Sequence, residues 1–339
     1  MKYTQYCYSL LDPQKQKIYQ LLYQGFSQFK TRISIQTDLS PEEINDVAIA
    51  VYNDNPMFFY LNISSFAYYE TMFGYEYVQT YTYNQSEIQT FKGHLQTGIQ
   101  NFKRKYIRPH MTDYEKVKVI HDYLVHTVIY DTKAEQNANP KHLNEASSVV
   151  GALLKGKAVC WGIASAFKLL CDACEIQSLV VVGDACLETE EGHAWNMAQI
   201  DGEFYHIDVT WDIKIKGDIS SCYDYFNLND RLMQVDHKWN MGFYPSCNAY
   251  EYNYYYRNRF YVGKLEELTK FIASRLIAKK TYVSVKFDNK MPNRLQLERA
   301  IKNGFWQAGK YCRYQYMISE KSHNIYIEIV DEGKKDTND

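Results

Sequence analysis

Apolar and polar positions in the first 85 residues follow helical spacing in some stretches and strand-like spacing in others. Residues 12–30 carry apolar side chains at three- and four-residue intervals, which predicts an amphipathic helix. Ser40, followed by Pro41 and two acidic residues, predicts the start of a second helix. Strand-like runs, rich in aromatic or β-branched residues, lie at 32–36, 57–64 and 75–83. The order helix, strand, helix, strand, strand indicates a small α+β layer.

The C-terminal part of the chain repeats this order of elements. Helical periodicity at 265–278 and 293–309 flanks a strand-like run at 281–287. Two further runs at 311–319 and 324–330 predict a β-hairpin. The two ends share no residue-level similarity, so we expect two independent α+β layers rather than a duplication.

The middle of the chain begins with two predicted helices, at 86–107 and 112–128. In the second, Thr112 and Glu115 have the spacing of a capping box. The polar stretch 131–145 is interpreted as a loop, either a lid or a solvated connection. Because 339 residues exceed the usual size of one domain, we expect three. These are an N-terminal α+β domain at 1–85, a central domain at 86–235 and a C-terminal α+β domain at 236–339.

Cys160 is the first candidate for chemistry in the central domain. It precedes a run whose apolar positions repeat at helical intervals up to Cys171 and Cys174, so we expect it at the start of a buried helix. The free N–H groups and positive dipole end of a helix favour the reactive thiolate there. A small buried core residue is the alternative interpretation of Cys160. The Cys171 and Cys174 pair has CxxC spacing, but no second pair follows, so core packing is preferred to zinc binding.

His193 and Asp208 supply partners for this thiol. Asp201-Gly202 is a favoured two-residue hairpin turn between two alternating runs. A two-residue turn places Ile200 opposite Glu203, which makes His193 and Asp208 diagonal neighbours on one face of the hairpin. The carboxylate would then hold the imidazole, whose second nitrogen can take the thiol proton. Together the three residues fit a Cys-His-Asp nucleophilic device.

These segments also resemble a known family. The stretches KAVCWGIASAFKLLCDACEI, GHAWN and FYHIDVTWD look like the core of the transglutaminase-like superfamily, and EKVKVIHDYLVHTVIYD resembles the preceding helix in its bacterial branch. The resemblance implies a papain-like α+β core, in which the helix bearing the cysteine packs on an antiparallel sheet. It also implies a catalytic triad, with Cys160 as thiol nucleophile, His193 as general base and acid, and Asp208 as the orienting carboxylate.

Three positions depart from the family pattern. Trp161 and Ile163 replace polar or aromatic residues common in the bacterial branch, which makes the floor around the nucleophile more apolar. Glu175 stands where a helix-ending glycine is common, so we expect a different cap there. None of the three touches the triad, and they bear on substrate preference.

The oxyanion hole is only partly indicated by the sequence. One donor should be the backbone N–H of Cys160. For the second we consider Tyr130 and the indole of Trp161. We expect Trp195 to shield the bond between the histidine and the aspartate, with core packing as the plainer alternative.

Five other polar and aromatic residues of the central domain are not assigned to chemistry. Trp211 and Asp212 are interpreted as structural, and His206 as an exposed strand residue rather than a second titrating group. His121 and His126 lie five residues apart rather than four, which excludes a pair of metal ligands on one helix face.

Composition narrows the partners. The net charge of −2, from 38 basic and 40 acidic residues, gives no electrostatic reason to bind nucleic acid or a membrane. We also expect no cofactor and no metal. No signal-like or membrane-spanning apolar segment is visible, which favours a cytoplasmic location. The eight cysteines lack disulfide spacing and are expected as thiols: Cys7, Cys160, Cys171, Cys174, Cys186, Cys222, Cys247 and Cys312.

The function we expect is that of a cysteine-dependent acyl-transfer hydrolase. Cys160 would attack a peptide or amide carbonyl of a protein or peptide substrate and form a thioester that water hydrolyses. Cross-linking of glutamine to an amine remains an alternative, because the triad does not distinguish the two acceptors. A non-catalytic protein- or glycan-binding module that retains the fold is the other alternative.

Overall fold

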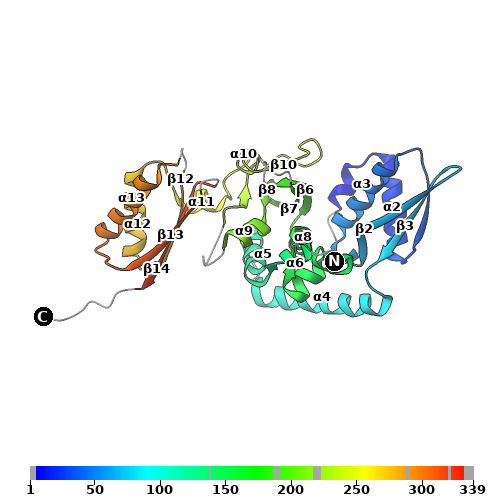
Figure 1. The fold of residues 1–339 in the computed structure, drawn as a ribbon, viewed down its shortest axis with the longest axis horizontal. Coiled ribbons are helices and arrows are strands. Elements are labelled where there is room, and N and C mark those ends of the chain that lie inside the picture. Colours follow the sequence, from blue (N-terminus) through cyan, green and yellow to red (C-terminus); the bar gives the residue numbers. More distant parts are fainter. Residues whose placement is uncertain are drawn as a thin grey trace. The chain divides into compact units, whose positions relative to one another are not determined.

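The structure is a computed structural model that describes residues 5–136, 139–185, 191–216, 223–287, 291–319 and 322–331. The chain divides into two compact units (Figure 1). The first unit comprises Met1–Lys214 and Leu228–Ala249, and the second comprises Ile215–Asn227 and Tyr250–Asp339. The finer division into three domains, with borders after residues 85 and 235, stays a prediction.

An α+β layer opens the first unit, as expected. Its elements are α1 (Tyr6–Leu10), α2 (Pro13–Ser27), β1 (Arg32–Gln36), α3 (Pro41–Asp54), η1 (Pro56–Phe58), β2 (Leu61–Thr71) and β3 (Gly74–Tyr81). The strands form an antiparallel sheet in the order β1-β3-β2. Ser40 closes a capping box with Glu43 at the start of α3, which confirms the helix start read from the sequence.

The strand expected at 57–64 begins later than its sequence suggested. Pro56 starts the short 3-10 helix η1, and β2 begins only at Leu61. The turn allows both Phe58 and Phe59 to be buried, whereas consecutive residues of a strand point to opposite faces.

Helices form most of the segment between this layer and the cysteine. They are α4 (Gln85–Tyr106), α5 (Asp113–Thr127), α6 (Thr132–Gln136), α7 (Pro140–Ala146) and the π-helical turn η2 (Gly151–Lys155), with the paired strands β4 (Ile129–Tyr130) and β5 (Lys157–Ala158). The expectation of a loop at 131–145 is wrong, although residues 137–138 lie outside the described residues. Asn139 caps α7 through Lys141 and His142, and helices this short carry no readable periodicity.

The core of the first unit is α8 (Cys160–Ala173) packed on an antiparallel sheet, which confirms the arrangement expected for the α+β core. The sheet runs β10-β6-β7-β8, formed by β6 (Ser178–Ala185), β7 (Glu191–Ile200), β8 (Glu203–Ile207) and β10 (His237–Trp239). β9 (Phe226–Leu228) and α10 (Asp230–Met233) come between β8 and β10 in the chain.

Gly162 allows α8 to lie close to the end of α7. A Cβ at this position would stand 2.2 Å from the carbonyl oxygen of Ala146. At the same place the N–H of Val159 donates to that oxygen, at 3.0 Å. The glycine and this hydrogen bond therefore fix where the first turn of α8, and with it Cys160, lies.

Glu175 ends α8 in the way a glycine would. Its φ of 64° is left-handed, and the N–H of Ile176 donates to the carbonyl oxygen of Cys171 at 2.9 Å, the bond of a glycine-type C-cap. The expectation that this cap is built differently is wrong, because the glutamate adopts the strained conformation itself.

The β7–β8 hairpin has the register expected from its Asp201-Gly202 turn. Ile200 pairs with Glu203, and both turn residues have positive φ. The second run does not stay a strand, since β8 ends at Ile207 and α9 (Val209–Lys216) begins directly after Asp208.

The second unit is a compact α+β layer built from α11 (Tyr254–Arg257), β11 (Tyr261–Val262), α12 (Leu265–Ile277), β12 (Tyr282–Phe287), α13 (Arg294–Gln307), β13 (Arg313–Ser319) and β14 (Asn324–Asp331). The sheet order is β11-β12-β14-β13, and the expected hairpin of β13 with β14 is confirmed. Leu268, Ile272 and Ile301 from the helices join Val285 and Ile327 from the strands in one buried cluster.

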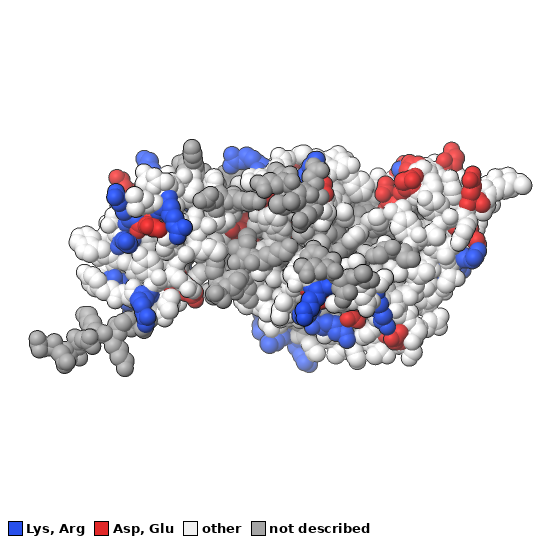
Figure 2. All heavy atoms as spheres, in the orientation of Figure 1, with Lys and Arg blue, Asp and Glu red and all other residues white. Residues whose placement is uncertain are grey.

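Acidic and basic side chains both occur, in small groups, on the face of the molecule drawn in Figure 2. None of the helices in the described ranges is long and apolar enough to cross a membrane. The cellular location and the partners stay predictions. The six cysteines within the described ranges carry no disulfide, and Cys186 and Cys222 lie outside those ranges.

Candidate active site

Cys160 is the first residue of α8, as expected. Val159 precedes it with extended backbone and offers no side-chain cap, so the first N–H groups of α8 receive no side-chain hydrogen bond from it. Unpaired N–H groups and the positive end of the helix dipole stabilise negative charge at this place. The side chain is half-buried against the cluster of Ala164, Val180 and Ala194. The thiol therefore combines a helix start with partial access to solvent.

His193 lies on β7 and joins the cysteine to the aspartate. Its Nε2 lies 2.7 Å from Oδ2 of Asp208, and its side chain is only 7 % exposed. Burial disfavours a charged imidazole, but the charge and hydrogen bond of Asp208, with those of Cys160, outweigh it and raise the pKa of His193 to about 10. Since Nε2 is engaged by the carboxylate, Nδ1 is the nitrogen left for the thiol. The structure thus brings the three residues together.

Asp208 has two roles in the local structure. Its Oδ2 accepts from His193, while its Oδ1 accepts from the backbone N–H of Trp211 at 3.1 Å and so caps the first turn of α9. The carboxylate is fully buried. Burial alone would raise its pKa, but the charge and hydrogen bond of His193 hold the pKa well below the ordinary value.

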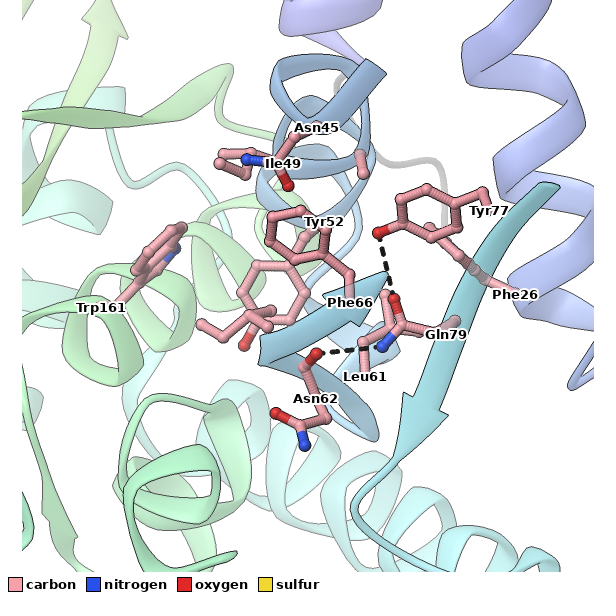
Figure 3. Close-up of a pocket in the computed structure, with 12 residues that line it drawn as sticks. Phe26, Asn45, Ile49, Tyr52, Leu61, Asn62, Phe66, Tyr77, Gln79 and Trp161 are labelled. Carbon is pink, nitrogen blue, oxygen red and sulfur yellow. Dashed lines mark hydrogen bonds between the residues drawn. The ribbon is translucent and has the colours of Figure 1, made fainter. Parts of the chain in front are cut away.

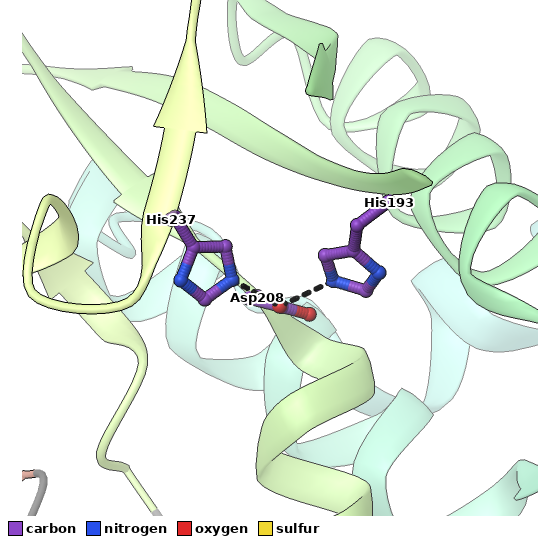
Figure 4. Close-up of side chains that lie close together, drawn as sticks. All are labelled: His193, Asp208 and His237. Carbon is purple, nitrogen blue, oxygen red and sulfur yellow. Dashed lines mark hydrogen bonds and ion pairs between the residues drawn. The ribbon is translucent and has the colours of Figure 1, made fainter. Parts of the chain in front are cut away.

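The sequence analysis missed a second histidine on the same carboxylate oxygen. Nε2 of His237, on β10, lies 3.1 Å from Oδ2 of Asp208, and Figure 4 shows the two imidazoles on either side of this carboxylate. Nδ1 of His237 lies 2.6 Å from Oδ1 of Asp236. No periodic pattern marks this position, which falls just beyond the border expected at residue 235. An acidic residue directly before a lone histidine was the one local signal.

Two tryptophans enclose these imidazoles. Trp195 stacks on His193 with ring centres 5.9 Å apart. It also forms a T-shaped pair with His237, with ring centres 5.1 Å apart. Trp211 lies 4.7 Å from His237. Trp195 is buried and stacked on His193; its shielding of the bond between His193 and Asp208 stays a prediction.

Trp161 is not free to act as an oxyanion donor. Its Nε1 donates to Oδ1 of Asn53 at 2.9 Å, and the indole has no second N–H. Tyr130 pairs with Ala158 on the strand that leads to the cysteine and packs beside Val159. It stays the proposed second donor, together with the backbone N–H of Cys160.

Trp161 also lines a cavity between the N-terminal layer and α8 (Figure 3). Tyr52 of α3 meets its ring edge-on at 5.9 Å, and Phe66 and Tyr77 stack in parallel on β2 and β3 at 6.2 Å. The amide of Gln79 contributes a polar group to the wall. The residue after the nucleophile thus borders a largely apolar cavity.

The expectation that His206 is exposed is wrong, because it is fully buried. Its Nδ1 accepts from the indole N–H of Trp195 at 3.0 Å, which places its own proton on Nε2, and that atom lies 2.9 Å from Oδ1 of Asp230. Cys247 lies in the same cluster. A metal on Nε2 would require a deprotonated ring, so these residues fit a hydrogen-bonded cluster better than a metal site.

The remaining candidates have the structural roles expected of them. Asp212 is buried and lies 2.8 Å from Nε2 of His121, which joins α9 to α5. Cys171 of α8 and Cys174, which directly follows this helix, are buried. Their burial raises the pKa of both thiols, which suits packing rather than reactivity.

Comparison with known proteins agrees with this geometry. The family model described as Transglutaminase-like superfamily matches residues 100–209, a range that includes Cys160, His193 and Asp208. Kyphoscoliosis peptidase of Homo sapiens is 25% identical over 186 residues, which cover 49% of this chain and 28% of that protein. The Mus musculus protein of the same name is 23% identical over 188 residues, with the same coverage. The chain thus matches less than a third of the length of these curated relatives.

A crystal structure of a TGase covers 53% of this chain and 50% of that chain, at 15% identity and a TM-score of 0.32. At this score the likeness adds nothing to the fold described above. Residues 100–209, which hold the cysteine, histidine and aspartate in order, thus match the transglutaminase-like superfamily.

Proposed function

We propose that this protein is a cysteine-dependent acyl-transfer enzyme that hydrolyses a peptide or amide bond. The observation that carries the proposal is the position of His193, which bridges Cys160 and the buried carboxylate of Asp208. A pKa of about 10 keeps this imidazole protonated at neutral pH beside the sulfur of Cys160. The pair therefore holds both a nucleophile and a proton donor.

The reaction follows from these positions. The sulfur of Cys160 attacks the carbonyl carbon, and the developing oxyanion is stabilised by the backbone N–H of Cys160 and, we propose, by Tyr130. Nδ1 of His193 gives its proton to the leaving amine as the C–N bond breaks, which leaves a thioester. His193 then takes a proton from water, which attacks the thioester and releases the carboxylic acid and the thiolate of Cys160 beside the protonated imidazole.

Hydrolysis is favoured over transfer to an amine. Both curated relatives reported above are named as peptidases, which supports water as the acceptor. Transamidation of glutamine uses the same thioester, and the family name keeps it as the second candidate. With a glutamine peptide and a fluorescent primary amine, mass spectrometry of the products distinguishes a free carboxylate from an amine adduct.

The first test measures the reactivity of the thiol itself. We expect iodoacetamide near neutral pH to alkylate Cys160 faster than Cys312, the other partly exposed cysteine within the described ranges. The difference should shrink in His193→Ala, because the thiolate loses its partner. Equal rates for the two cysteines in the unmodified protein would rule out an activated thiol.

The second test traps the intermediate. Incubation with a peptide library should give an acyl adduct on Cys160 that is lost in Cys160→Ala and kept in Cys312→Ala. Failure to detect an adduct or any product with the unmodified protein would favour a non-catalytic binding module.

A further inference from the structure

Asp208 accepts from two imidazoles through a single oxygen. Oδ2 lies 2.7 Å from Nε2 of His193 and 3.1 Å from Nε2 of His237, and the carboxylate and His237 are both fully buried. Only His193 is required by the mechanism above. The second histidine is a buried titratable group whose role in the site is not explained by that mechanism.

His237 lies between two carboxylates. Its Nε2 faces Asp208, and its Nδ1 lies 2.6 Å from Oδ1 of Asp236. A neutral imidazole carries one proton and can donate to only one of them, so both bonds form only when the ring is doubly protonated. Burial opposes this charge, but the two carboxylates outweigh burial and raise the pKa of His237.

The other titratable groups that face His237 are also histidines. His193 on β7 has its ring centre 5.6 Å away. The pKa of His206 on β8 is lowered, mainly by burial and in smaller part by the charge of His237. Trp195 and Trp211, which also lie against its ring, do not titrate. From Asp236 through His237, Asp208 and His193 to Cys160, acidic side chains and imidazoles therefore alternate.

We propose that His237 is a positioning residue whose fixed positive charge orients Asp208 and moderates the basicity of His193. This inference rests on the proposed function. The carboxylate must hold His193 in place, but an unopposed buried carboxylate would also bind the proton of His193 too tightly for transfer to a leaving amine. A second imidazolium on the same oxygen shares that negative charge, so His193 releases its proton more readily.

The variant that separates charge from packing is His237→Gln. Glutamine places an N–H near the position of Nε2 and keeps a bond to Asp208, but it carries no charge. Without the charge 5.6 Å away, the pKa of His193 should rise, and the alkaline limb of the profile of kcat/KM against pH should move up by about one pH unit. We expect kcat/KM near neutral pH to fall about tenfold, with KM little changed, since the proton is held more tightly in the step that expels the amine.

His121→Gln is the matched control. His121 is also fully buried between two carboxylates, at 3.2 Å from Asp122 and 2.8 Å from Asp212, but it does not bond to Asp208. Its replacement should lower the free energy of unfolding by a similar amount and should leave the alkaline limb in place. An alkaline limb at the same pH in the unmodified protein and in both variants would overturn the inference, even if activity fell in each variant.

Asp236→Asn tests the same charge if His237→Gln does not fold. It removes the carboxylate that holds the second proton and leaves the bond of His237 to Asp208 intact. The alkaline limb should move in the same direction. In the unmodified protein, ¹⁵N NMR should show both ring nitrogens of His237 protonated near neutral pH, and a singly protonated ring would contradict the inference.

Alkylation of Cys160 by iodoacetamide keeps this inference distinguishable from the proposed function. Slow alkylation of Cys160 relative to Cys312 in the unmodified protein means that the proposed function has failed. The other outcome is selective alkylation of Cys160. If the upper inflection of its alkylation rate against pH is then the same in His237→Gln as in the unmodified protein, only the role of His237 is overturned.

Discussion

Replacement of Asp208 by asparagine should move the pH range in which His193 is protonated. Asp208 provides the largest opposing contribution to the burial of His193, through its charge and the 2.7 Å hydrogen bond. Without that charge, the pKa should fall from about 10 toward the ordinary value near 6.5. At pH 8 the protonated fraction would then drop from nearly all to roughly 3 %, a loss of about 30-fold in the active form.

The amide also removes the constraint on the tautomer of His193. Its NH₂ group can donate to Nε2, which would place the ring proton on Nδ1 and direct it at the thiol. A wrong tautomer adds a further loss of about 10²-fold or more in kcat. We therefore expect Asp208→Asn to lower kcat/KM at pH 8 by at least 10³-fold and to shift the alkaline limb downward.

The assay is the pH profile of kcat/KM, accompanied by the pH profile of Cys160 alkylation, which needs no substrate. Asp172→Asn is the control, because Asp172 is also buried and lies 3.1 Å from Nζ of Lys168, about three helical turns along α8 from Cys160. It should leave both profiles unchanged. An alkaline limb that stays in place in Asp208→Asn would refute the assignment of this carboxylate as the partner of His193.

Three further outcomes can be measured. Glu175→Gly should raise the free energy of unfolding in urea by about 0.5–1 kcal/mol, because the left-handed conformation no longer strains a side chain; a loss of stability would contradict the cap. Gly162→Ala should lower the unfolding free energy by several kcal/mol, since its Cβ meets the oxygen of Ala146, whereas Gly98→Ala, where a Cβ meets nothing within 4 Å, should raise it by up to about 1 kcal/mol. Trp161→Phe should keep kcat within about threefold; a fall of about 10²-fold would restore the indole as an oxyanion donor.

The core of the site could be predicted from the sequence because its signals are local. The Asp201-Gly202 turn fixes the register of the hairpin, and the register puts His193 on a known face. The apolar stripe after Cys160 identifies a helix with the cysteine at its start. These two short-range patterns carry most of the geometry of the triad.

What could not be predicted depends on contacts between distant segments. His237 follows Asp208 by 29 positions and lies on a three-residue strand, too short for a periodic signal. The run after Asp208 contains Val209 and Thr210, which favour strands, yet it forms α9 because Asp208 caps the helix. His206 was placed on the correct strand, but its burial comes from Asp230, which no local pattern connects to it.

The first turn of α9 is where the fold and the site depend on the same charges. Asp208 and Asp212 lie one helical turn apart, and each accepts from a buried imidazole on another element, His237 of β10 and His121 of α5. Burial opposes the charge on both rings, but their carboxylate partners outweigh it and raise both pKa values. The stabilisation from these pairs is therefore complete below the ordinary histidine value near 6.5 and is lost as pH rises through the raised values. Loss of either proton on the alkaline side lowers the free energy of unfolding, but only His237 bonds the carboxylate that holds His193, so only its proton should link the pH limit of stability to the pH limit of activity.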